Sequence, residues 1–263
     1  MNHSQKCLNC ESVVNGNFCA YCGQKTAIHR INFKNFITHD FLHGLFHVEK
    51  GMLFTAKESL IRPGKAAIDY IEGKRIRYYN VFYFILVLIG INLFLGNYYD
   101  QFAEIYSIQH TKDVNDALVN KLEHFFTDYA KIIIFSFVPL FAINSFILFR
   151  KRKLNFSEHI IIAGITFLGI LLINTFDTLV SFLEFTAYFD SISDIVSGVS
   201  GLLIFILPIY SYYQTFKDFY KKASFSLRMI LFTLLMFIEL IAFMLITVGI
   251  LSDWKFGRVS YNM

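Results

Sequence analysis

Long apolar runs dominate the chain beyond residue 80 and constrain its fold more than any other feature. A helix that crosses a bilayer needs about 20 mostly apolar residues. Five runs come close to or exceed that length, and buried helices of a soluble protein explain five in succession poorly. Lipid does not tolerate open backbone groups, so helices are the expected form. The expected spans cover residues 78–96, 132–149, 160–180, 195–213 and 229–251.

The composition agrees with a lipid environment. Hydrophobic residues make up 55% of the 263 residues, compared with roughly 45–50% in soluble domains. The 31 Phe and 15 Tyr suit lipid-facing surfaces and the membrane–water interfaces. Residues 1–30 are polar and lack the apolar segment of a signal peptide, so we expect the first span to serve as both signal and anchor.

The positions of Lys and Arg predict how the chain crosses the membrane. Residues 1–77 hold 11 of the 24, and the segments between spans two and three and between spans four and five hold 4 each. The alternate segments and the tail hold the other 5. Because Lys and Arg are enriched on the cytoplasmic side, the sequence predicts a cytoplasmic N-terminus and a C-terminus outside.

Four cysteines form two Cys-x2-Cys pairs within the first 22 residues, and the chain has no others. Two facing pairs supply a tetrahedral four-sulfur site, which suits structural Zn2+ and leaves no open coordination position. A segment this short cannot build a core, so the metal would supply its folding free energy. The predicted zinc ligands are Cys7, Cys10, Cys19 and Cys22.

Other uses of these cysteines fit less well. Disulfides are disfavoured because the charge distribution puts this end in the reducing cytoplasm. A redox dithiol lacks the surrounding βαβ pattern, whereas iron is chemically compatible with four thiolates and remains the alternative metal. Gly23, after the second pair, fits a turn with a positive φ. Gly16, in the intervening Asn-Gly-Asn, fits a hairpin turn.

The segment between ribbon and first span, residues 31–77, is predicted to lie at the inner membrane surface. Over residues 33–61 apolar side chains occupy one half of a helical wheel, which is typical of an interfacial helix. Pro63 and Gly64 break this helix, and a second short helix ends at Gly73. Three cations then follow where anionic lipid headgroups are expected: Lys74, Arg75 and Arg77.

Three histidines lie four residues apart on the polar half of that wheel, His39, His43 and His47. Glu58 shares the polar half, which would face water, and Leu53 belongs to the apolar half. The histidine stripe is compatible with a second metal site or with pH sensing. We favour a solvated polar face, because no HExxH motif accompanies the stripe.

Few polar side chains lie within the expected spans. Glu239 is central in the fifth span, where an ionised carboxylate costs on the order of a few kcal/mol. Asn174 and Asp177 share a face near the outer end of the third span, and Asn144 and Asn92 lie in the second and first. Hydrogen bonds between helices are the favoured role for these residues, and a polar transport path is the alternative.

Three sequence motifs precede or adjoin the first span. The cysteine pairs are followed by a Lys-Gly…Arg-Pro-Gly-Lys segment and then by Tyr-x2-Gly-Lys-Arg-x2-Tyr. The residues concerned are Cys7, Cys10, Cys19, Cys22, Gly23, His43, Lys50, Gly51, Thr55, Lys57, Leu60, Arg62, Pro63, Gly64, Lys65, Tyr70, Gly73, Lys74, Arg75 and Tyr78. This part resembles an uncharacterised bacterial family of zinc-ribbon integral membrane proteins, a domain of unknown function. The resemblance implies a ribbon and the bacterial inner (cytoplasmic) membrane, and it brings no activity. The five-span architecture is more weakly similar to Yip1-type membrane proteins.

These observations predict an all-α membrane protein with three parts. A zinc ribbon occupies residues 1–30, amphipathic interfacial helices occupy residues 31–77, and a bundle of about five transmembrane helices occupies residues 78–263. We expect the lipid bilayer and an unidentified cytoplasmic protein as partners. A net charge of +4 gives little support for nucleic acid, and a homo-oligomer is left open.

Three functions are compatible with this architecture. The favoured one is non-enzymatic: the ribbon and surface helix recruit or sense a cytoplasmic partner, since no nucleophile, base or cofactor loop is recognisable. The second is a transporter or channel component that uses Glu239 with Asn174 and Asp177. The third is a membrane metalloprotein built on the histidine stripe.

Overall fold

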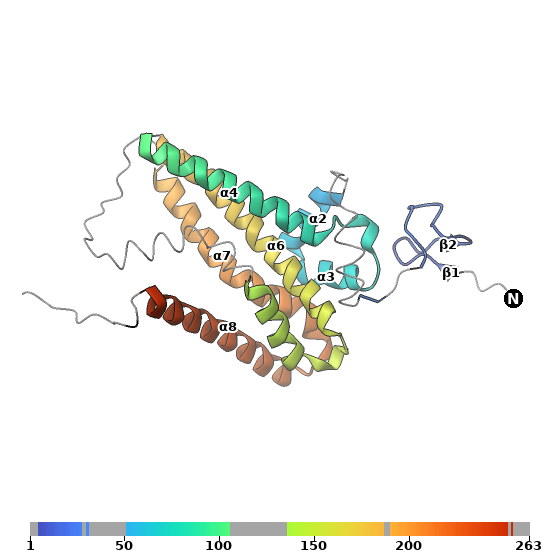
Figure 1. Ribbon diagram of the computed structural model, residues 1–263. Helices are drawn as coiled ribbons and strands as arrows, with labels where there is room; N and C mark the ends of the chain where they lie inside the picture. The colour runs from blue at the N-terminus through green and yellow to red at the C-terminus, as the bar shows by residue number, and fades with distance from the viewer. Residues whose placement is uncertain are drawn as a thin grey trace, which may run out of the picture.

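The computed structural model describes residues 5–27, 30–31, 51–105, 136–186, 190–251 and 254, and it is mainly helical (Figure 1). The helices are α2 (Gly51–Ile61), α3 (Pro63–Ile71), α4 (Val81–Ile105), a helix at Ser136–Leu148, α6 (Phe156–Ser181), α7 (Asp190–Phe216) and α8 (Lys222–Leu251). Short 3-10 turns adjoin them, including η2 (Arg75–Arg77), η3 (Arg150–Arg152), η4 (Phe182–Phe185) and η5 (Lys217–Phe219).

Within the part of the chain that the structure describes, four helices are long and apolar enough to cross a membrane, which confirms an all-α membrane fold. They cover Arg75–Ala103, Phe156–Phe185, Ser191–Phe219 and Lys222–Ile250. The remaining expected span, residues 132–149, contains the shorter apolar helix Ser136–Leu148, and residues 132–135 lie outside the described part of the chain.

The N-terminal ribbon is built on two short antiparallel strands, β1 (Gln5–Lys6) and β2 (Val13–Val14). These strands flank the first cysteine pair, and a single bridge between Phe18 and Lys25 flanks the second. Gly16 was predicted at a hairpin turn. It lies instead in a bend between the two halves of the ribbon, because each cysteine pair forms its own turn.

The central helix of the bundle is α6, whose residues from Ile161 to Leu171 are all buried. It packs against α2, α3, α4 and α7. A capping box fixes its start: the Glu158 N–H donates to the Asn155 side chain (2.9 Å), and the Asn155 N–H donates to the Glu158 carboxylate (2.7 Å). This cap defines the start of α6, directly after the basic residues 150–153.

The Phe-rich composition builds the core around the ribbon-proximal half of α6. Phe149, directly after the Ser136–Leu148 helix, stacks on Phe216 of α7 with ring centroids 4.4 Å apart. Phe232 of α8 lies 4.3 Å from the ring of Tyr212. These aromatic contacts join the end of the Ser136–Leu148 helix, the end of α7 and the first half of α8.

The helices α2 and α3 form a hairpin at the end of the bundle that faces the ribbon (Figure 1). The break at Pro63 is confirmed, and Gly73, with a φ of 100°, follows the end of α3. One expected side-chain position on α2 is wrong: Glu58, predicted to face water, is only 5% exposed. It packs against the protein, because α6 lies on that side of α2. Lys57, on the same polar half, is exposed, and Leu53, on the apolar half, is 83% exposed.

Candidate metal centre and intramembrane polar groups

The four cysteine sulfurs come together at one point of the ribbon, all within 4.8 Å of one another. The closest pairs join the two halves: Cys7 to Cys22 at 3.6 Å and Cys10 to Cys19 at 3.5 Å. In a tetrahedral site with Zn–S bonds of about 2.3 Å, the sulfurs lie about 3.8 Å apart. The predicted ligands therefore fit one tetrahedral metal ion of the size and softness of Zn2+.

Each cysteine pair is held in the same backbone turn. The Glu11 N–H donates to the Cys7 carbonyl oxygen (2.9 Å), and the Gly23 N–H donates to the Cys19 carbonyl oxygen (2.8 Å). Glu11 and Gly23 both have a positive φ, 62° and 74°. The role of Gly23 is confirmed, whereas Glu11 was missed because a glutamate rarely marks a left-handed position. Its place four residues after Cys7 was the available signal.

Ser12 polarises the thiols on one side of the site. Its hydroxyl oxygen lies 2.8 Å from Cys10 Sγ and 3.2 Å from Cys19 Sγ. This hydrogen bonding lowers the pKa of Cys19 to about 6 and also lowers that of Cys10. Burial raises the pKa of Cys22 to about 11. Because the thiolate is the metal ligand, Cys19 is prepared for binding at neutral pH, whereas a metal ion that binds Cys22 would have to displace its thiol proton, which is released to water.

The ribbon docks on η2, the turn that leads into the first span. Arg77 donates to the side-chain and backbone oxygens of Asn9, both at 2.9 Å. The Ile76 N–H donates to the Gln24 side chain at 3.3 Å. Asn9 lies inside the first cysteine pair and Gln24 just after the second, so both halves of the metal site contact the bundle.

The cations expected at lipid headgroups have partners within the protein. Lys74 pairs with Asp69 at 2.6 Å, and the Arg75 Nε donates to the Tyr70 carbonyl oxygen at 3.3 Å. Arg77 binds the ribbon, as described above. Headgroup binding by the three stays a prediction, because partly exposed cations can serve both roles.

A second anchor joins the chain after the ribbon to the start of α6, and the sequence analysis missed it. The Arg30 guanidinium makes a two-pronged ion pair with the Glu158 carboxylate (2.7 and 2.8 Å). The pairing raises the pKa of Arg30 further above its ordinary value. The Asn155-x2-Glu158 capping pattern was the only sequence signal for this site.

Asn174 and Asp177 make hydrogen bonds between helices. The Asn174 amide donates to the Asn92 side-chain oxygen, and the Asn92 amide donates to the Thr175 hydroxyl, each at 2.7 Å. The Asp177 carboxylate accepts from the Ser197 hydroxyl of α7 at 3.0 Å. These bonds link α6 to α4 and α7, which is the packing role that the sequence favoured.

Glu239 is hydrogen-bonded to Asn144 of a neighbouring helix. The Asn144 amide donates to Glu239 Oε1 at 2.9 Å, and this bond links α8 to the Ser136–Leu148 helix. The other carboxylate oxygen, Oε2, is buried and has no hydrogen-bond partner among the described residues. The carboxylate is therefore only half satisfied by the described part of the chain.

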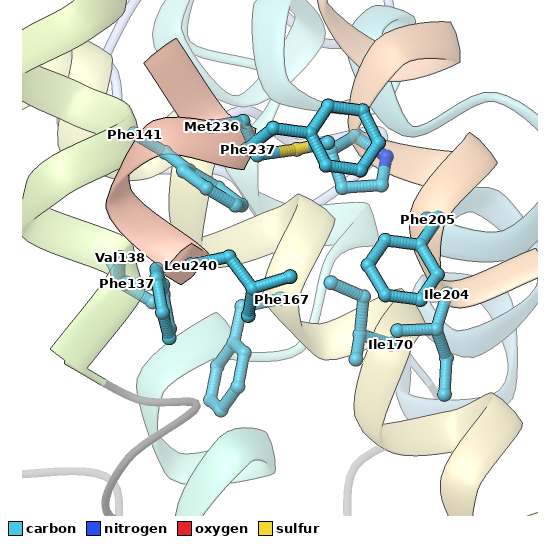
Figure 2. Close-up of a pocket in the computed structure, with 11 residues that line it drawn as sticks. Phe137, Val138, Phe141, Phe167, Ile170, Ile204, Phe205, Met236, Phe237 and Leu240 are labelled. Carbon is cyan, nitrogen blue, oxygen red and sulfur yellow. The ribbon is translucent and has the colours of Figure 1, made fainter. Parts of the chain in front are cut away.

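An apolar cavity of about 250 Å3 lies between the Ser136–Leu148 helix, α6, α7 and α8 (Figure 2). Its walls are entirely hydrophobic and include Phe167, Phe205 and Phe237. Glu239 is not one of the lining residues. This apolar cavity gives no polar route to the Glu239 carboxylate.

Two further groups of histidines complete the comparison with the sequence analysis. His39, His43 and His47 are among the residues that the structure does not describe. A buried histidine that the sequence analysis did not single out is His159, whose Nδ1 lies 2.7 Å from the Ser145 hydroxyl. Both side chains are almost fully buried, and the pair joins α6 to the Ser136–Leu148 helix.

No family model, no curated protein and no solved structure matches the chain. The resemblance to a bacterial zinc-ribbon family therefore stays a prediction. What the geometry shows is a membrane protein of several apolar helices with a four-cysteine cluster near its N-terminus that could hold a metal ion.

Proposed function

We propose that this chain is a non-enzymatic membrane protein whose metal-bound ribbon recruits a cytoplasmic protein partner. The observation that carries the proposal is the exposure of large apolar side chains on the ribbon. Tyr21 is 84% exposed and Phe18 is 63% exposed, and Val13 and Leu8 are exposed as well. Exposed aromatic side chains on a small rigid module are typical of protein-binding surfaces.

The metal has a structural role in this proposal. The buried apolar core of the ribbon consists of Cys7, Cys19 and Val14, which is too little to fold a domain alone. A four-thiolate zinc site has no open position for a substrate. The ion would therefore hold the exposed side chains of the ribbon in a fixed arrangement.

In this proposal the bundle lies in the bacterial inner membrane and the ribbon lies in the cytoplasm. Arg30, which follows the ribbon in the chain, donates to the Lys153 carbonyl oxygen at 2.8 Å. The ribbon therefore lies at the end of the bundle that carries the basic residues 150–153. Arg150, Lys151 and Lys153 are exposed there. A basic end on the ribbon side supports this orientation through the positive-inside rule.

Site-specific photocrosslinking of the full-length chain in cells tests the proposal. A photoreactive residue at Tyr21 should crosslink to one defined protein, and the same residue at Lys221, an exposed charged position of the bundle outside the ribbon, should not. Cys19→Ser should abolish the crosslink, because the metal site loses a ligand. Absence of a crosslink from Leu8, Phe18 and Tyr21 alike, or a crosslink that survives Cys19→Ser, would contradict ribbon-mediated recruitment.

A transporter or channel component is the second candidate. One observation favours it: Glu239 Oε2 is buried without a hydrogen-bond partner among the described residues, and an intramembrane acid of this kind often marks an ion path. Ion and solute flux into proteoliposomes should then fall in Glu239→Gln. Identical flux in the two proteins would remove this role from Glu239.

A further inference from the structure

The turn between α2 and α3 lies deep along the central helix of the bundle. A Cβ atom built on Gly169 of α6 would come within 2.7 Å of the Ser59 carbonyl oxygen and of Leu207 on α7. The end of α2 therefore rests directly on the α6 backbone. Gly169 is 13 residues after Phe156, where α6 begins, which corresponds to about 20 Å along a helix.

This depth corresponds to the middle of the membrane. Residues 160–176 of α6 contain no charged side chain, and Gly169 lies next to the centre of that stretch. Residues 195–216 of α7 are likewise uncharged, and Leu207 lies near their centre. Because charged residues avoid hydrocarbon, the centres of two uncharged stretches mark the mid-depth of the lipid independently.

The two outer ends of the hairpin lie at the basic surface. A Cβ atom on Gly51, the first residue of α2, would meet the Arg77 carbonyl oxygen at 3.0 Å and the Tyr79 nitrogen at 2.9 Å. After the end of α3, Glu72 pairs with Arg152 of η3 at 3.3 Å. The 11 residues of α2 extend about 16 Å, long enough to reach from this surface to about mid-depth.

The faces of the hairpin are sorted for a lipid environment. Thr55 and Ser59 are fully buried against the bundle, and their hydroxyls donate to backbone oxygens one turn back, at 2.8 and 2.9 Å. Leu53, Leu60 and Ile61 are exposed. Lys57 and Lys65 are exposed as well, and their long side chains can extend toward the basic surface while their stems stay in lipid. Small polar groups inside and large apolar groups on most of the outer face are expected where the surrounding solvent is hydrocarbon.

The polar groups that the turn brings inward have partners. Pro63 ends α2, and the Tyr210 hydroxyl donates to the Ile61 carbonyl oxygen at 3.3 Å. Arg62 forms an ion pair with Glu58 one turn earlier. Irregular backbone at membrane depth is tolerated where protein groups satisfy it in this way.

We propose that α2 and α3 form a re-entrant hairpin, which enters the lipid from the ribbon side, reaches about mid-depth at Ser59 and turns back at Arg62–Pro63, so that Gly64 already lies beside Ser211 and Thr215 on the way to the surface. The exposed side chains of Leu53, Leu60 and Ile61 contact lipid acyl chains. The Glu58–Arg62 ion pair is then an intramembrane charge pair. The hairpin adds no crossing, so it leaves the orientation of the spans unchanged, and it does not depend on what the ribbon binds.

Tryptophan depth measurements test this hairpin, because the chain has a single Trp, Trp254. In a Trp254→Phe background, Trp is introduced singly at Leu53 or Ile61 of the full chain in liposomes. The lipids carry bromine either near the carbonyl or near the methyl end of the acyl chain. The two positions are 8 residues apart on α2, so Ile61→Trp should report a depth about 12 Å greater than Leu53→Trp.

Ile206→Trp, at an exposed position next to Leu207, supplies the reference for mid-depth and should match Ile61→Trp. Equal shallow quenching at Leu53 and Ile61 would show a helix flat on the surface, and absence of quenching would show a hairpin in water; either result overturns the proposal. A second measurement needs no substitution. A lipid with a photoreactive group at the methyl end of its acyl chain should label the peptide that contains Leu60 and Ile61, and absence of label there would also overturn it.

Discussion

Arg77 donates two hydrogen bonds to Asn9, one to the side-chain oxygen and one to the backbone oxygen, each 2.9 Å long. Asn9 lies between two metal-binding cysteines, and Arg77 ends the turn that precedes α4. This residue pair joins the candidate metal site to the first span, beside the weaker bond from the Ile76 N–H to the Gln24 side chain. The position of the ribbon on the bundle therefore depends on a contact whose acceptor a metal ion bound by the four cysteines would hold in place.

Asn9→Ala should loosen the ribbon from the bundle without emptying the metal site. The variant removes the side-chain acceptor and leaves all four cysteines in place. Because the contact is exposed, we expect a cost of about 1 kcal/mol or less, equivalent to up to about fivefold in a local opening equilibrium. Trypsin cleavage after Arg77 should become faster by a similar factor at unchanged zinc content. Asn17→Ala, an exposed position of the same ribbon, is the matched control, and equal cleavage rates in the two variants would refute the coupling.

Ser12→Ala should weaken metal binding in a pH-dependent manner. The Ser12 hydroxyl is the main cause of the lowered pKa of Cys19, about 6, so its loss should move that pKa toward the ordinary value near 9. Protons compete with the metal below the pKa of a thiol. The affinity of the variant should therefore fall below that of the original protein between about pH 6 and 9, by up to about tenfold for each unit of pKa change.

Above pH 9 the two affinities should converge, because Cys19 is then a thiolate in both proteins. Competition with a chromophoric chelator across this pH range measures the difference. Thr26→Ala is the control, since its hydroxyl donates to the Gly16 carbonyl oxygen and not to a cysteine. A constant ratio of affinities at all pH values would contradict an effect through the pKa of Cys19.

The spans and the cysteine cluster could be predicted from sequence because both are local patterns. Run length alone identifies a span, and the spacing of Cys7, Cys10, Cys19 and Cys22 alone brings four thiols together. The environment of Glu58 could not be predicted in this way. A helical wheel assumes that a helix has water on one side and lipid on the other, whereas α2 has α6 on its polar side.

The same limit applies to the partners of polar groups within the membrane. The sequence showed that Asn92, Asn174 and Glu239 need hydrogen bonds, but which of them meet depends on which helices are neighbours. The close approach of Ser59 to Gly169 joins residues 110 positions apart. It is possible because Gly169 has no side chain, and the sequence alone does not show that α2 lies against this glycine.

Gly64→Ala should destabilise the bundle, because α3 and α7 approach closely at this residue. A Cβ atom on Gly64 would collide with the Ser211 carbonyl oxygen and come within 2.7 Å of the Thr215 hydroxyl oxygen. Overpacking of this kind costs typically about 1–3 kcal/mol. Gly90→Ala is the control, since nothing lies within 4 Å of its Cβ position on α4. Thermal unfolding in detergent should show a lower midpoint for Gly64→Ala alone, and equal midpoints would contradict the close packing of α3 on α7.

The Asn144–Glu239 pair should show a measurable coupling if its role is to hold α8 against the Ser136–Leu148 helix. Hydrogen bonds between transmembrane helices average about 0.6 kcal/mol and reach about 1.7 kcal/mol. The upper part of that range is expected here, because Asn144 is buried and is the only described partner of Glu239. A double-mutant cycle with Asn144→Ala and Glu239→Ala, read from unfolding in detergent, measures this coupling. The matched cycle replaces Asn144→Ala with Ile143→Ala, an exposed neighbour, and should give about zero. A vanishing coupling in the first cycle would remove the packing role and leave the half-satisfied carboxylate of Glu239 to be explained by transport.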